Sequence, residues 1–114
     1  MSRWMFFALL LTGCPPETKQ DAGSCNFAPV TVCPSPAPTY DALKPVFDAH
    51  CNICHNGQDN GPWPLNDYES VYDWSELIRS DLLDCTMPQA DAGTDFTDDD
   101  RRLILTWIRC GMPR

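Results

Sequence analysis

The chain has 114 residues, which is enough for one domain with a modest core. Asp and Glu outnumber Lys and Arg by 16 to 8. This acidic balance argues against a nucleic-acid partner and favours a partner protein with a basic docking surface.

The N-terminal residues 1–13 have the features of an export signal. A single charge, Arg3, is followed by an apolar run that ends at Leu11. The run is much shorter than the about 20 apolar residues of a membrane-spanning helix, and it has the length of a signal-peptide core. The four residues 11–14, Leu-Thr-Gly-Cys, resemble a bacterial lipobox, in which lipid is added to the cysteine after cleavage.

We therefore predict a signal peptide over 1–13 and lipid on Cys14. The alternative is an ordinary secretory signal that happens to contain a cysteine. Lipid on Cys14 implies a protein on the periplasmic side of a bacterial membrane, with the outer membrane or cell surface favoured over the inner membrane.

Residues 14–38 are rich in proline and show no helical periodicity, so we predict a lipid-anchored tether. An exported chain can carry disulfides. Cys25, Cys33, Cys85 and Cys110 lie outside the lipobox and the motif at 51–55, and four cysteines allow three pairings. A local Cys25–Cys33 bridge is the simplest.

The folded domain is predicted to cover 39–114 and to be all-α, because no stretch alternates apolar and polar residues convincingly. Helical spacing of apolar residues predicts a helix that starts near Thr39 and one or two short helices within 67–85. The clearest helix begins after Thr97, has three aspartates in its first turn, and stops near Gly111.

Residues 51–55 read Cys-Asn-Ile-Cys-His, the attachment motif of c-type haem. Two thiols on one helical turn can each form a thioether with a porphyrin vinyl group, and the following imidazole can bind the iron. We therefore predict one haem c, covalent through Cys51 and Cys54, with His55 as its axial ligand. A structural zinc site, a thioredoxin-like dithiol and chance are the alternatives, but zinc needs further ligands and a thioredoxin needs a βαβ pattern.

The segment from about 40 to 113 resembles a small class I cytochrome c domain of bacterial lipoproteins. Besides the haem motif, the resemblance rests on three short motifs, which are Pro-Trp-Pro-Leu-Asn-Asp-Tyr at 62–68, Cys-Thr-Met-Pro at 85–88 and Trp-Ile-Arg-Cys-Gly-Met-Pro at 107–113. It implies three to five helices around one covalent haem, with the first and last helices crossing near Phe47 and Trp107.

The resemblance also implies further site residues. Met87 matches the methionine ligand that precedes the last helix, whereas Met112 is expected to pack back on the end of that helix. The Nδ1 atom of His55 is expected to donate to the carbonyl of Pro64 or Pro62. The Trp63 side chain would cover the haem edge, donate to a propionate, or simply pack.

The implied fold brings the end of the last helix under the Met87 loop. On that basis we predict a Cys85–Cys110 disulfide that clamps this loop, and therefore a Cys25–Cys33 disulfide in the tether. Together, these features predict a lipid-anchored monohaem c-type cytochrome, which carries single electrons outside the bacterial inner membrane and is not an enzyme. The alternatives are a haem enzyme or gas or redox sensor with an open or labile sixth iron site, and a haem-bearing subunit of a larger membrane complex.

Overall fold

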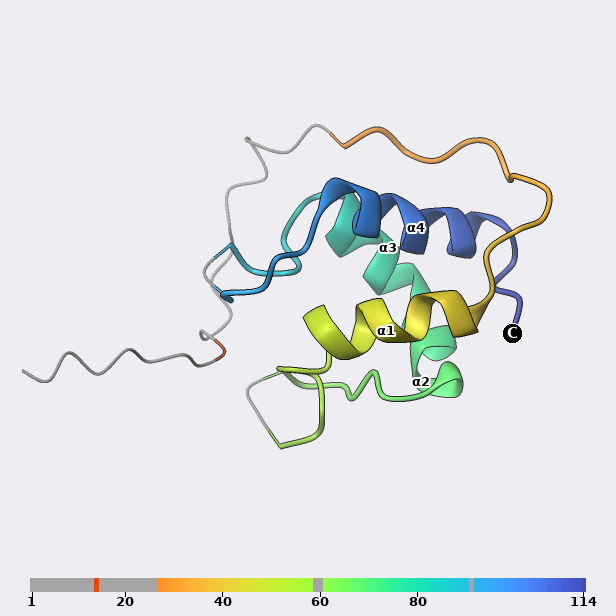
Figure 1. Ribbon diagram of the computed structural model, residues 1–114. Helices are drawn as coiled ribbons and strands as arrows, with labels where there is room; N and C mark the ends of the chain where they lie inside the picture. The colour runs from red at the N-terminus through yellow and green to blue at the C-terminus, as the bar shows by residue number, and fades with distance from the viewer. Residues whose placement is uncertain (1–13, 15–26, 59–60, 91) are drawn as a thin grey trace, which may run out of the picture.

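The computed structural model describes residue 14 and residues 27–58, 61–90 and 92–114. In this part of the chain there are four helices and no strand, so the predicted all-α class is confirmed (Figure 1). The helices are α1 (Tyr40–His50), α2 (Tyr68–Asp73), α3 (Ser75–Leu83) and α4 (Asp98–Arg109). None of the helices among these residues is long and apolar enough to span a bilayer. The predicted signal peptide and Cys25 lie outside the described residues.

Helix α1 begins after Thr39 and buries Leu43 and Phe47. The Thr39 side chain makes no capping hydrogen bond. Pro45 lies inside the helix and beyond its first turn. Because proline has no backbone N–H, the carbonyl of Asp41 loses its usual donor within the helix.

The predicted helical stretch 67–85 divides into two short helices at Trp74. Asp67 caps α2 by accepting a hydrogen bond of 2.8 Å from the backbone N–H of Ser70. Val71 and Leu82 are buried, one from each helix. The break at Trp74 places the indole ring beside the loop that precedes α2, where it stacks on Trp63 at 4.5 Å between ring centroids.

Helix α4 has the start and the stop that its sequence predicts. Thr97 and Asp100 form a reciprocal capping box, and the aspartates of the first turn complement the helix dipole. At the other end, the Gly111 N–H donates to the Ile108 carbonyl at 3.2 Å, and the Met112 N–H donates to the Trp107 carbonyl at 3.0 Å. These two bonds form a Schellman motif, in which Gly111 has a φ of 85°.

Helices α1 and α4 pack against each other, and Phe47 and Trp107 are fully buried at the core. The last residues of the chain close over the same core. The Trp107 indole donates to the Pro113 carbonyl and the Tyr68 hydroxyl donates to the Met112 carbonyl, both at 2.8 Å. The rings of Tyr40, Tyr68 and Trp107 contact one another, and the Tyr40 N–H donates to the Pro113 carbonyl.

Residues 27–38 are not a free tether. Figure 1 shows this extended segment running alongside α4, and Cys33 is disulfide-bonded to Cys110 at the end of that helix. Phe27 lies against the guanidinium groups of Arg101 and Arg102. The predicted Cys85–Cys110 and Cys25–Cys33 pairings are therefore wrong. Cys85 is itself disulfide-bonded, but not to Cys110.

Candidate functional site

An apolar pocket lies between α1, α3, α4 and the two long loops. Its walls are mainly aliphatic and aromatic side chains, and cysteine, histidine and methionine side chains lie among them. Of the residues predicted for the site, the pocket brings together seven, namely Cys14, Cys51, Cys54, His55, Pro62, Trp63 and Met87. Pro64 is not part of the lining.

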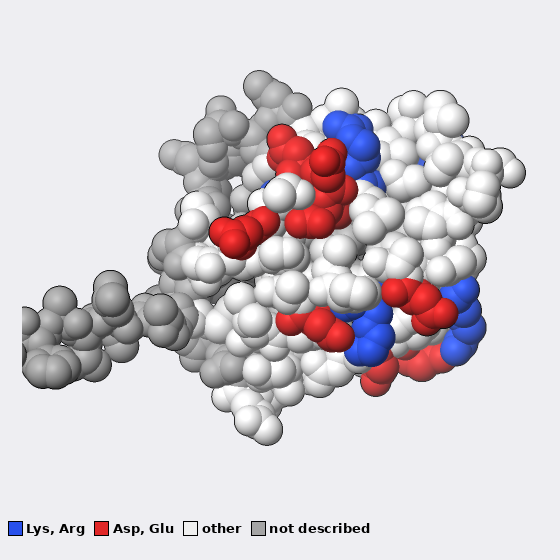
Figure 2. Space-filling view, viewed as in Figure 1, with Lys and Arg blue, Asp and Glu red and all other residues white. Residues whose placement is uncertain are grey.

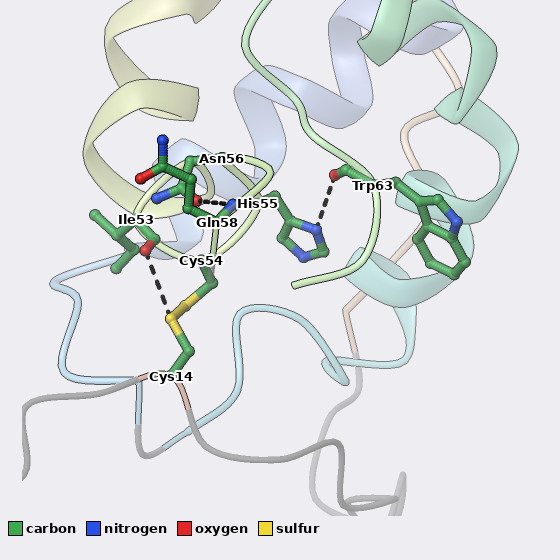
Figure 3. Close-up of a disulfide and its surroundings, with 7 residues drawn as sticks. All are labelled: Cys14, Ile53, Cys54, His55, Asn56, Gln58 and Trp63. Atoms are coloured by element: carbon green, nitrogen blue, oxygen red, sulfur yellow. Dashed lines mark hydrogen bonds between the residues drawn. A yellow bond between two sulfur atoms is a disulfide. The ribbon is translucent and has the colours of Figure 1, made fainter. Parts of the chain in front are cut away.

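His55 is held by hydrogen bonds on three sides. Its N–H donates to the Cys51 carbonyl at 2.9 Å, and its carbonyl accepts from Leu65 at 2.8 Å. The ring atom Nδ1 lies 3.0 Å from the carbonyl oxygen of Trp63 (Figure 3). Since a carbonyl only accepts, Nδ1 donates, and the neutral ring keeps its lone pair on Nε2.

The partner of His55 is thus Trp63, one residue away from either predicted proline. The Trp63 ring stacks on Trp74 and is 37 % exposed. Its role in the structure is therefore packing at the edge of the pocket, and the backbone carbonyl of the same residue orients the imidazole.

Met87 lies in the loop between α3 and α4 and contributes to the pocket wall. Its N–H points to the Asp81 carbonyl at 3.4 Å, and its own carbonyl accepts from Arg101 at 3.3 Å. The Met87–Pro88 peptide bond is cis. Met112 lies at the end of α4 and packs on the core instead, as predicted. Of these two methionines, Met87 is the one in the pocket wall.

The structure contradicts the predicted haem c bound through Cys51 and Cys54. Cys54 is joined to Cys14 by a disulfide (Figure 3), and its sulfur has no valence left for a thioether. In addition, the described residues contain no group of three or more His, Cys, Asp or Glu side chains placed to hold a metal ion. The motif alone suggested two available thiols, because nothing in residues 51–55 indicates that a distant cysteine takes one of them.

Cys51 is the free thiol of the pocket. Burial, and secondarily the Asp100 carboxylate, raises the pKa of this thiol to about 12. At neutral pH Cys51 is therefore protonated, and a thiol attacks disulfides only as the thiolate. This environment argues against thiol–disulfide exchange between Cys51 and the Cys14–Cys54 bond. A thioredoxin-like dithiol would also need a βαβ pattern, and the described residues contain no strand.

Lipid attachment to Cys14 stays a prediction. A thioether to lipid and the disulfide to Cys54 use the same sulfur atom, so one molecule cannot carry both. The lipidated molecule would keep Cys54 as a thiol.

Cys14→Ser distinguishes these two forms. If the native chain is lipidated, the variant should move completely from the membrane to the soluble fraction, with the same number of titratable thiols in the unfolded protein. If the native chain carries the disulfide, fractionation should not change and one thiol should be gained. Membrane fractionation with thiol titration on the same samples checks the prediction, and unchanged fractionation would refute the lipid anchor at this residue.

Gly61 allows the loop to approach His55 closely. A Cβ atom at this position would lie 2.5 Å from the Cys54 carbonyl oxygen and 3.0 Å from Cγ of His55. The Gly61 N–H also donates to that carbonyl at 3.2 Å. The loop can therefore close on the imidazole only if this residue has no side chain.

Gly61→Ala is expected to push the loop off His55 and to destabilise the fold by about 1–3 kcal/mol, as overpacking does. Urea unfolding of Gly61→Ala and of the native chain measures the loss. An unchanged free energy of unfolding in Gly61→Ala would show that the loop accommodates a Cβ atom at this position without moving.

Three further residues of the site were not predicted. His50 lines the pocket, and its ring contacts Thr94 and lies 3.5 Å from a carboxylate oxygen of Asp100. Gln89 is buried in the lining and its Oε1 atom has no hydrogen-bond partner. Arg101 is 8 % exposed although it lies on α4 among charged residues. Local sequence gave no sign of these placements, because each depends on the loop that covers it.

The charges of the surface are unevenly placed. Figure 2 shows acidic side chains gathered over the first turn of α4, where the helix carries Asp98, Asp99 and Asp100. The chain as a whole has a formal charge of −8.

Comparison with family models, with curated proteins and with solved structures found no match to this chain.

Proposed function

We propose that this chain is an exported single-electron carrier with the helix arrangement of a small class I cytochrome c. The main observation behind the proposal is that His55 and Met87 line one pocket. The two residues are 32 positions apart, in loops on either side of α2 and α3, and they line the same apolar pocket. An imidazole and a thioether in an apolar wall suit a redox group far better than a hydrolytic site.

His55 and Met87 are the protein's proposed ligands to that group. The Trp63 carbonyl fixes the imidazole so that Nε2 has the lone pair, which is the arrangement that metal-binding histidines share. An imidazole and a thioether would supply two ligands to such a group, and the thioether would favour its reduced state. Thioether bonds to Cys51 and Cys54 are not part of this proposal.

The helix packing supports the same proposal. The first and last helices contact each other through Phe47 and Trp107, as the resemblance to class I cytochromes implies. The loop that carries Met87 directly precedes α4. Export through residues 1–13 would place the carrier outside the cytoplasm, where the acidic surface favours a basic redox partner.

A reductive titration of the purified full chain, followed by absorbance, tests the function. We expect one step with a stoichiometry of one electron. The disulfides take up two electrons each, at potentials that for structural cystines are typically below about −300 mV. If only two-electron steps are found, and thiol formation accounts for all of them, the chain is not a single-electron carrier.

A further inference from the structure

Arg101 lies directly behind the loop that carries Met87. Its Nη1 atom donates to the Leu82 carbonyl at 2.6 Å and to the Met87 carbonyl at 3.3 Å. One guanidinium nitrogen thus joins the end of α3 to the proposed ligand residue. Leu82 lies in the last turn of α3, where carbonyls lack a donor within the helix, and Met87 lies in the loop that follows.

Two aromatic rings lie close to the guanidinium group of Arg101. Its carbon atom lies 5.1 Å from the centroid of the Phe96 ring and 5.8 Å from that of Phe27. Contacts of this kind favour a cation, and more so when water is excluded. Phe96 belongs to the loop that carries Met87, so this ring contact also joins Arg101 to that loop.

The charge of Arg101 is buried, and the Asp98 carboxylate acts on it only from beyond ion-pair distance. In the described part of the chain no carboxylate lies within ion-pair distance of it, and its Nε atom is buried with no partner. Burial lowers the pKa of the guanidinium, and an arginine side chain stays protonated in proteins. Burying a cation without an ion pair costs free energy. We therefore expect this charge to have a function at its position.

We propose that Arg101 is a positioning residue, which holds Met87 in the pocket through the two carbonyls and adds a buried positive charge beside the site. The part that concerns charge rests on the proposed electron-transfer function. The part that concerns position does not, and each has its own readout.

Nuclear magnetic resonance of the full chain labelled at the methionine methyl groups tests the position. In Arg101→Leu the Met87 methyl signal should shift and broaden, while the Met112 signal stays unchanged. The Met87 amide should exchange its hydrogen about tenfold faster or more, since a hydrogen bond to a charged group stabilises by about 1.5–3 kcal/mol.

Arg102→Leu is the matched control. It removes the same charge from the neighbouring, exposed residue, which also lies on the Phe27 ring but does not reach the loop. It should leave Met87 unchanged. If Arg101→Leu does not fold, Arg101→Lys takes its place, because lysine reaches a single carbonyl and should still shift the Met87 signal. An unshifted Met87 signal in the folded variant would overturn the proposal.

The reduction potential tests the charge. The one-electron step should move to lower potential in Arg101→Leu and return close to the native value in Arg101→Lys. A potential that is equally low in both variants would show that the charge has no role. If no one-electron step exists, the proposed function fails while the resonance experiment still decides whether Arg101 holds Met87.

Discussion

Trp107→Ala is expected to lower the free energy of unfolding by about 3–5 kcal/mol, which is the usual loss when a buried aromatic side chain is removed. The indole is fully buried between α1 and α4, and its N–H donates to the Pro113 carbonyl. The substitution leaves a cavity in the centre of the core and removes a hydrogen bond that holds the C-terminus. For a domain of this size, such a loss is a large part of the total stability.

Trp63→Ala is the matched control, because it removes the same side chain from the surface. It should cost about 1 kcal/mol, mainly through the lost stacking on Trp74. Urea denaturation followed by circular dichroism compares the two. Similar losses would mean that α1 and α4 do not enclose Trp107 as described.

Cys33→Ser with Cys110→Ser is expected to lower the free energy of unfolding by about 4 kcal/mol. The bond links residues 77 positions apart, and on the chain-entropy account long loops gain the most from a cross-link. The segment 27–38 should also separate from α4, because without the disulfide only side-chain contacts such as those of Phe27 and Val30 hold it there.

Limited proteolysis measures the second effect. Cleavage within 27–38 should be slow in the native chain and fast in the double variant. Val32→Ser serves as control, since this side chain in the same segment is 73 % exposed and its loss should change stability by less than about 0.5 kcal/mol. Rapid cleavage of the native chain would contradict the attachment of the segment to α4.

The helices were predictable because their signals are local. In α4, the cap at Thr97, the first-turn aspartates and Gly111 each act within one turn, and the structure confirms their roles. These local signals do not show how much of the helix is buried, which in the structure includes Arg101, Ile104, Leu105 and Trp107.

The disulfides were not predictable from local sequence. Spacing suggested that Cys33 pairs with a nearby cysteine, but its partner, Cys110, lies near the C-terminus. No residue close to either cysteine in the sequence indicates this pairing. The same holds for Cys54, whose motif suggested a thioether while the structure has a bond to Cys14. The prediction that His55 donates to a backbone carbonyl is confirmed, but the carbonyl belongs to Trp63 and not to Pro62 or Pro64. The direction of a loop carbonyl depends on backbone angles that the sequence does not reveal.

The central claim is that the pocket between His55 and Met87 is where the electron is received. The most direct test is the potential of the one-electron step in Met87→Leu and in Met112→Leu, two identical substitutions at partly buried sites. The account predicts a lower potential in Met87→Leu, because the thioether ligand is lost, and the native potential in Met112→Leu. A native potential in Met87→Leu, or equal shifts in both variants, would contradict it.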